Sequence, residues 1–150
     1  MRGRVAYHSE EMDRLLNINV RGVFITTQVA LKHMKRGGRI VTIGSCLGER
    51  VMTPGLVPYS ATKGAVKIFS QSLSRELGSL GITVNNVQPG PIDTDLNPAS
   101  GDWAVPQKAA TSLDRYGHVE EVAALVAFVA GPEASYITGA NLTVDGGTNA

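Results

Sequence analysis

The pattern of apolar and polar positions predicts three long helices. Apolar side chains recur at spacings of three and four residues, which place them on one side of a helix, in Ser9–Arg36, Tyr59–Leu77 and Val119–Ala130. Acidic residues follow Ser9, and glycine comes directly after each segment, as is usual at helix starts and ends. Gly22 and the β-branched residues around it weaken the first pattern, so we expect a bend between Asn19 and Gly22.

Three shorter runs predict strands, at Arg39–Ser45, Ile82–Val87 and Asn141–Val144. The first is largely apolar, which is typical of a buried parallel strand. Because helices separate the runs, we expect parallel strands and an α/β fold. Residues 91–117 contain three prolines and scattered polar positions, and their length predicts a mobile lid. With 150 residues and no linker, the chain is predicted to be a single domain spanning residues 1–150.

Composition narrows the range of functions. The chain is 43% hydrophobic and has a formal net charge of +1 without a basic block, which argues against binding to nucleic acid. No apolar run is long enough for a membrane span or a signal peptide, and the single cysteine excludes an internal disulfide. We therefore expect a cytoplasmic protein without membrane contact. The three histidines have no partners at ligand spacing, so no metal site is predicted.

Tyr59 and Lys63 form the first candidate for chemistry. They lie four residues apart where the second helix is predicted to begin, so they share one side of it, and Pro58 suits the first turn. An ammonium held beside a phenol favours the phenolate. Ser45, at the end of the preceding strand, adds a hydroxyl donor, and the trio suits proton transfer to or from a carbonyl oxygen. From spacing alone, an ordinary helix start with a solvated lysine explains the pair equally well.

Gly44–Gly48 invites a different interpretation. Centred on Cys46, it reads Gly-x-Cys-x-Gly directly after a strand, the pattern of a nucleophile elbow, and Asp93 or Asp95 with His118 would complete a triad. An elbow must lead straight into a helix, however, and proline and glycine follow here instead. A phosphate-binding Gly-x-x-x-Gly turn fails for the same reason, since it too needs a helix next.

Several of these features occur together in one family. The chain resembles the C-terminal part of a short-chain dehydrogenase/reductase, and within that family it is most similar to the 3-oxoacyl-acyl-carrier-protein reductases and related sugar or alcohol dehydrogenases. The resemblance begins near Ser9 and covers nearly all the rest of the chain. Five features stand in the family's order: Asn19-Val20-Arg21-Gly22, Ser45, Tyr59-Ser60-Ala61-Thr62-Lys63, Pro89-Gly90 with Ile92-Asp93-Thr94, and Leu142-Thr143-Val144-Asp145-Gly146-Gly147.

The resemblance implies a partial Rossmann-type, doubly wound parallel sheet, of which this chain holds the last three strands. It also implies reversible hydride transfer between NAD or NADP and a small carbonyl compound or secondary alcohol, in a homodimer or homotetramer. Tyr59 would be the general acid/base, Lys63 would contact the tyrosine and the nicotinamide ribose, Ser45 would bind the developing alkoxide, and Asn19 would hold a water. The cofactor residues implied are Tyr59, Lys63, Pro89, Gly90, Ile92 and Thr94.

The family's glycine-rich phosphate-binding turn and its Asn-Asn-Ala-Gly segment are not found in this sequence. We therefore expect the chain to carry the proton-transfer half of the site and to bind the cofactor weakly or not at all by itself. We also expect the first predicted strand to be an edge strand. The alternative is a truncated, catalytically inactive member that acts only as an oligomerisation or interaction module.

Overall fold

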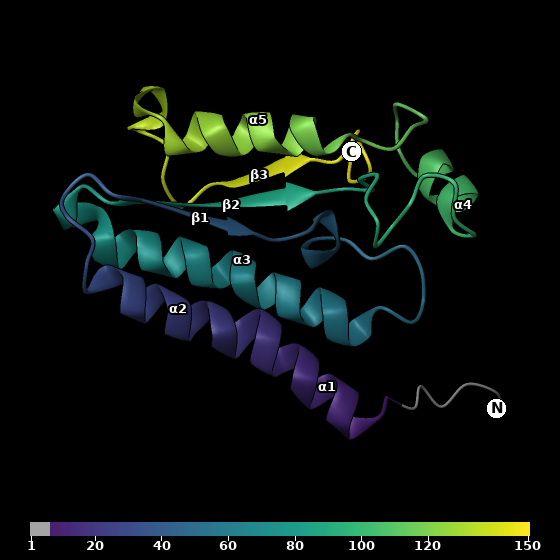
Figure 1. Ribbon diagram of the computed structural model, residues 1–150, viewed down its shortest axis with the longest axis horizontal. Coiled ribbons are helices and arrows are strands. Elements are labelled where there is room, and N and C mark those ends of the chain that lie inside the picture. Colours follow the sequence, from purple (N-terminus) through teal and green to yellow (C-terminus); the bar gives the residue numbers. More distant parts are fainter. Residues whose placement is uncertain (1–6) are drawn as a thin grey trace.

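The computed structural model describes residues 7–150, which form three layers (Figure 1). The middle layer is a sheet of three parallel strands in the order β1-β2-β3, formed by Arg39–Ile43, Thr83–Pro89 and Asn141–Val144. The central strand β2 pairs with both neighbours, and its first six residues are buried. Helical crossovers join the strands. The predicted α/β class, with a partial Rossmann-type parallel sheet, is confirmed.

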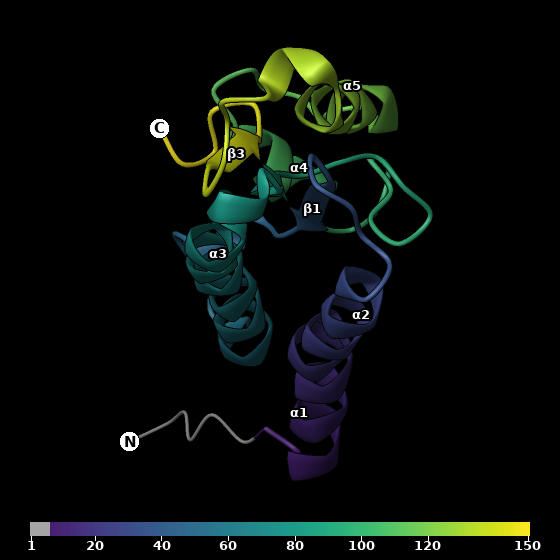
Figure 2. The ribbon, with the colours of Figure 1, turned by 90° about the vertical axis from the view of Figure 1, so that its left-hand side faces the viewer.

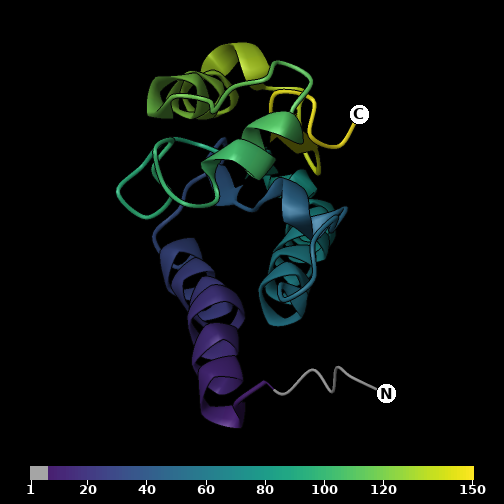
Figure 3. The same cartoon turned by 90° about the vertical axis from the view of Figure 1, so that its right-hand side faces the viewer.

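Helices cover both faces of the sheet. Helix α5 (Val119–Ala130) lies on one face, while α3 (Val57–Leu77) and the arm formed by α1 and α2 lie on the other (Figure 1). Figures 2 and 3 show that this arm and α3 lie on the same side of the sheet and that both extend away from it. The remaining helical elements are α1 (Ser9–Leu16), the π-helical turn η1 (Asn17–Arg21), α2 (Gly22–Leu31), α4 (Ala104–Ala109) and the 3₁₀ turns η2 (Cys46–Gly48), η3 (Gly78–Leu80) and η4 (Pro132–Ala134).

Several predicted bounds differ from the structure, and β2 spans Thr83–Pro89 instead of Ile82–Val87. The first strand ends at Ile43 instead of Ser45, and it is not buried, because it is the sheet edge and Ile43 is 48% exposed. The first helix ends at Leu31 instead of Arg36, and the turn that follows packs Met34 against the core. The bend predicted near Asn19 coincides with the π-helical turn η1, where the helical repeat widens locally.

The apolar core lies where the strands begin. Leu73 and Leu77 of α3 pack against Ile82 and Val84 at the start of β2, and each of the four is at least nine-tenths buried. Partly buried residues from α2, the turn after it, β1 and α3 complete this cluster: Leu31, Met34, Ile40 and Phe69. Burial of this apolar surface is the main stabilising contribution that the sequence pattern predicts.

An apolar groove of about 580 Å³ runs between α2 and the free edge of β1. Its walls include Ile18 and Val23 from the helical arm and Ile40 and Ile43 from the strand. An edge strand leaves one side of its backbone without a strand partner, and exposed apolar surface beside it is typical of an interaction site. Within residues 7–150, no helix combines the length and apolar character needed to cross a membrane.

The segment between β2 and α5 is held in shape by contacts within itself. Ile92 and Gly117 pair as an isolated parallel bridge, which closes the two ends of the segment. Inside it, the side-chain amides of Asn97 and Gln107 exchange two hydrogen bonds, at 3.0 and 3.1 Å. The buried Tyr116 donates its hydroxyl to Asn97 at 3.3 Å. That this segment moves over a substrate stays a prediction.

Candidate active site

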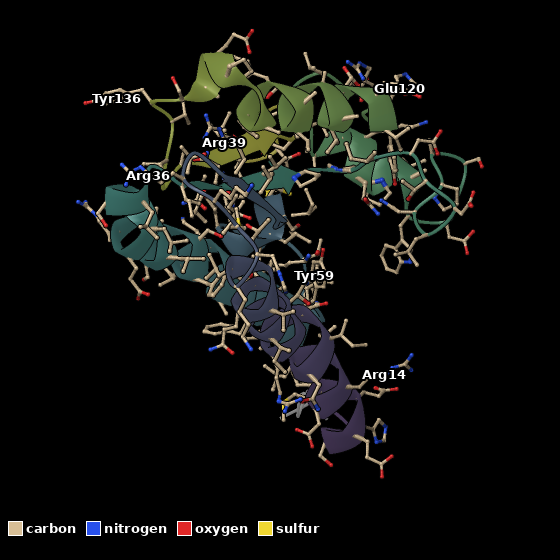
Figure 4. All side chains as sticks on the ribbon, turned by 60° about the vertical axis from the view of Figure 1, so that its left-hand side comes forward. Arg14, Arg36, Arg39, Tyr59, Glu120 and Tyr136 are labelled. Carbon is tan, nitrogen blue, oxygen red and sulfur yellow. The ribbon has the colours of Figure 1, made fainter. Side chains whose placement is uncertain are left out.

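Helix α3 presents Tyr59 and Lys63 beside the end of β1. The helix begins at Val57, two residues earlier than predicted, with Pro58 in its first turn. The ammonium nitrogen Nζ of Lys63 donates to the carbonyl oxygen of Ile43 at 3.0 Å and lies 5.7 Å from the centre of the Tyr59 ring. Figure 4 shows Tyr59 at the end of the molecule towards which the strands run, away from Arg36 and Tyr136. The pair therefore bridges the helix and the strand.

Asn19 joins the same group of side chains from the π-helical turn. Its amide nitrogen Nδ2 donates to the hydroxyl of Thr62 at 3.1 Å, and that hydroxyl donates to the backbone carbonyl of Tyr59 at 2.7 Å. Thr62 is fully buried. Sequence reasoning missed this threonine, although it stands between the tyrosine and lysine of the motif. Thr62 fixes Asn19 against the helical turn that carries Tyr59.

Ser45 follows β1 directly and is buried. Its hydroxyl oxygen accepts a hydrogen bond from the backbone N–H of Leu47 at 3.2 Å, which caps the short turn η2. Two glycines let this turn sit close to its neighbours. A Cβ on Gly48 would lie 2.9 Å from the backbone carbon of Lys63, and one on Gly44 would lie 2.7 Å from the Asn86 side chain. Close packing against α3 and β2 accounts for this glycine spacing.

Pro89, Gly90, Ile92 and Thr94 lie along the end of the neighbouring strand. Pro89 is the last residue of β2, and the N–H of Gly90 donates to the carbonyl of Val144 at 3.1 Å. The exposed Thr94 uses its hydroxyl oxygen to accept from the N–H of Asn97 at 3.2 Å. The structure thus places Lys63 beside the Tyr59 ring and links Asn19 to the backbone of Tyr59 through Thr62. It places the Pro89–Thr94 segment after the adjacent strand, without a direct hydrogen bond to them.

Comparison with known proteins identifies this arrangement. A family model described as "Enoyl-(Acyl carrier protein) reductase" matches residues 2–149. A short-chain dehydrogenase from Burkholderia cenocepacia, solved in complex with NADP, has a TM-score of 0.96 and 48% identity, and the match covers 99% of this chain. The chain belongs to the short-chain dehydrogenase/reductase family. The predicted resemblance is confirmed.

Two curated members of the family match at similar levels. The cyclic-di-GMP-binding biofilm dispersal mediator protein of Escherichia coli is 44% identical over 139 residues, and the match covers 93% of this chain and 59% of that protein. The 3-oxoacyl-acyl-carrier-protein reductase of Vibrio harveyi is 40% identical over 144 residues, with 92% and 57% covered. The match to the Burkholderia structure covers 61% of that chain. This short-chain dehydrogenase/reductase therefore spans about three-fifths of the length of these relatives.

Burial shifts the acidity of two groups in this region. It lowers the pKa of Lys63, because an ammonium loses hydration when it is taken out of water. It raises the pKa of the Cys46 thiol to about 11, and the carboxylate of Asp145 adds to that effect. A lysine with a lowered pKa gives up its proton more readily, which suits a group that passes a proton on.

The nucleophile-elbow interpretation of Cys46 fails in the structure. After Cys46 the chain makes one 3₁₀ turn, Cys46–Gly48, and α3 begins only at Val57. A buried thiol with a pKa near 11 also supplies little thiolate at neutral pH. His118 instead precedes α5, where its backbone N–H donates to the carboxylate of Glu121 at 2.8 Å. Within residues 7–150, no three His, Cys, Asp or Glu side chains gather closely enough to hold a metal ion.

Proposed function

We propose that this chain carries the proton-transfer part of an NADP-dependent oxidoreductase that interconverts a carbonyl compound and a secondary alcohol. The proposal is carried by the grouping of these side chains: Asn19 is linked through Thr62 to the backbone of Tyr59, and Lys63 lies beside the Tyr59 ring and donates to the end of β1. Family membership supports the reaction class, and the NADP complex of the Burkholderia relative favours NADP over NAD. The 3-oxoacyl-acyl-carrier-protein reductases among the relatives favour a 3-oxoacyl thioester as substrate.

Each side chain has one part in this mechanism. In the reductive direction, the phenol of Tyr59 gives its proton to the carbonyl oxygen as negative charge develops there. Ser45 donates a hydrogen bond to the same oxygen, an interaction that strengthens in the transition state. Lys63, whose pKa is lowered by burial, returns a proton to the tyrosine. Asn19, held by Thr62, retains the water that supplies this proton.

The polar groups near the ends of β1 and β2 are suited to binding the nicotinamide and ribose of a cofactor. A bound nicotinamide cofactor supplies or accepts the hydride. Tyr59 and Lys63 would contact its ribose, and the nicotinamide amide would be held by the backbone and side chains of Pro89, Gly90, Ile92 and Thr94. Thr94 is exposed, and Lys63 is only partly buried, so both polar groups are accessible to a ligand.

We also propose that the chain by itself binds NADPH weakly. The expected glycine-rich turn, which would bind the pyrophosphate at a helix N-terminus, is not found in the sequence. The open edge of β1 and the groove beside it favour an additional strand at this position in the active assembly. Isothermal titration of the purified chain with NADPH tests this part of the proposal, and micromolar affinity would contradict it.

A second candidate function is that of an interaction module without activity. Apolar side chains are exposed along the helical arm and on α5, which also favours a homodimer or homotetramer. Those on the arm include Ile18, Phe24, Ile25 and Val29, and those on α5 include Val119 and Phe128. Sedimentation equilibrium measures the oligomeric state. The module interpretation is favoured only if association occurs without any carbonyl reduction.

The decisive experiment compares the wild type with Tyr59→Phe in NADPH oxidation assays with a 3-oxoacyl thioester. Loss of the phenolic proton is expected to lower kcat by about 10²–10⁴-fold, the usual contribution of a general acid. Tyr136→Phe is the matched control, because Tyr136 is fully exposed and is predicted to leave the rate unchanged. Equal rates near zero for wild type and Tyr59→Phe would favour the interaction module.

A further inference from the structure

Two amide side chains from distant parts of the chain hold the peptide that follows β1. Gln88, near the end of β2, donates from Nε2 to the carbonyl oxygen of Ser45 at 3.3 Å. Asn149, almost at the end of the chain, donates from Nδ2 to the carbonyl oxygen of Cys46 at 2.8 Å. Two consecutive carbonyl groups of the loop that carries Ser45 are therefore fixed by donors from two other strand ends.

Both amides are only half satisfied. The oxygen Oε1 of Gln88 and the oxygen Oδ1 of Asn149 are buried, and neither has a hydrogen-bond partner among residues 7–150. Gln88 is fully buried. A buried polar atom without a partner destabilises a fold, and an apolar side chain of similar size would avoid that cost. A residue that lowers stability in this way is expected where its other contact serves function.

Asn149 is itself held firmly. The side-chain carboxylate of Asp145 accepts hydrogen bonds from the N–H groups of Gly147 and Asn149, at 3.0 and 3.1 Å. The hydroxyl of Thr148 donates to the backbone carbonyl of Asp145 at 2.6 Å. These hydrogen bonds within residues 145–149 fix the position of Asn149 relative to β3. Its side chain can therefore hold the loop after β1 in a fixed position.

We infer that Gln88 and Asn149 are positioning residues for Ser45. By holding the carbonyls of Ser45 and Cys46, they fix the orientation of the peptide and hence of the serine hydroxyl. This inference rests on the proposed function, in which Ser45 binds the developing alkoxide. Since that interaction is made mainly in the transition state, loosening the loop lowers kcat and leaves KM nearly unchanged.

The experiment uses the near-isosteric variants Gln88→Met and Asn149→Leu, with two readouts. The first is kcat and KM for NADPH and a 3-oxoacyl thioester, where we expect kcat to fall about 3–10-fold per variant, as for one lost neutral hydrogen bond. The second is the rate at which a thiol reagent modifies Cys46, the only cysteine of the chain and 4% exposed. Because Cys46 reacts only when the loop opens, its modification should accelerate by a similar factor.

Ser112→Ala is the matched control. Ser112 donates to the carbonyl of Gly147 at 3.1 Å, so its loss removes one hydrogen bond to the same turn but leaves the Asp145 contacts that hold Asn149 and both contacts to the loop. It should change neither readout. Asn149→Asp keeps the size of the side chain but replaces the donor with an acceptor, and it should reproduce the faster modification of Cys46.

Unchanged modification rates in Gln88→Met and Asn149→Leu would overturn the inference, as would a rise in KM with kcat unaltered. If the wild type shows no turnover even at millimolar NADPH, the proposed function fails independently of this inference. The Cys46 modification rates then still decide whether the two amides hold the loop.

Discussion

The two ends of the same sheet are held together by different forces. Where the strands begin, Leu73, Leu77, Ile82 and Val84 form an apolar cluster without polar side chains. Where the strands end, side-chain hydrogen bonds to backbone carbonyls join segments far apart in sequence. They include those of Lys63 to Ile43, Gln88 to Ser45 and Asn149 to Cys46.

This difference separates stability from chemistry. Apolar burial is non-directional and depends on the area removed from water, so the beginning of the sheet requires only side chains of suitable volume. Hydrogen bonds require particular donors and acceptors at fixed distances, so the end of the sheet requires particular residues. Substitutions at the first end should therefore change stability, and substitutions at the second end should also change the geometry of the site.

The largest stability effect is expected from Leu77→Ala at the apolar end. Leu77 is 8% exposed, and its truncation removes buried methyl groups and leaves a cavity, which costs about 2–5 kcal/mol of unfolding free energy. Urea denaturation measures this loss. Leu80→Ala is the control, since Leu80 lies close by in η3 but is 45% exposed, and its cost should stay within about 0.5 kcal/mol. Equal losses in the two variants would contradict the location of the core.

Sequence patterns predict the apolar end well. The observed bounds of α5 and β3 are those predicted, because both combine a clear apolar pattern with flanking glycine or polar residues. The pattern also predicted the parallel α/β sheet. For β1 the apolar pattern wrongly predicted a buried strand, because an edge strand and a buried strand can have the same apolar composition, whereas the edge position expected from the family resemblance is confirmed.

The polar end was predicted only in part. Tyr59, Lys63 and Ser45 were found from their spacing and predicted elements, and Asn19 only through the family resemblance; whether they carry the proposed reaction stays a prediction. The supporting contacts of Thr62, Gln88 and Asn149 were missed. Their partners lie 43 or 103 residues away in the sequence, and no local periodicity relates residues at such distances.

A smaller effect on stability, with an effect on the site, is expected from Gly90→Ala. A Cβ at Gly90 would lie 2.6 Å from the Cα of Asp145, so the turn after β3 must move, at a cost of about 1–3 kcal/mol. Thermal denaturation measures the loss. Gly78→Ala is the control, because a Cβ there meets no atom within 4 Å, and it should be neutral or slightly stabilising. If Gly90→Ala is as stable as the wild type, Gly90 and Asp145 do not lie as close together as the structure places them.

Burial of Cys46, at the polar end of the sheet, predicts that the free energy of unfolding depends on pH in alkaline solution. Its pKa is raised from 9.0 to about 11 in the folded chain, so between these values the unfolded state loses the thiol proton while the folded state keeps it. The stability contribution is complete below pH 9 and is lost as pH rises towards 11, in total about 2 kcal/mol. The measurement is urea denaturation from pH 8 to 11 for the wild type and Cys46→Ala. A parallel decline in the two proteins would show that Cys46 is not buried in the folded chain.

The smallest effect is expected at the surface, where Arg115 and Glu121 form a bidentate ion pair at 2.7 and 2.8 Å. The Arg115 guanidinium, together with the backbone N–H of His118, lowers the pKa of Glu121 from 4.5 to about 2. The folded chain therefore keeps this carboxylate ionised in a range where the unfolded chain is protonated, and the resulting stability is lost as pH falls from about 4.5 to 2. Glu121→Gln should lack this part of the acid dependence.

Because both groups are solvated, 1 M NaCl should weaken the stability difference between the wild type and Glu121→Gln, whereas the effect of Leu77→Ala should persist in salt. A difference that salt leaves unchanged would mean that Glu121 acts through the hydrogen bond that starts α5, and not through its charge pair.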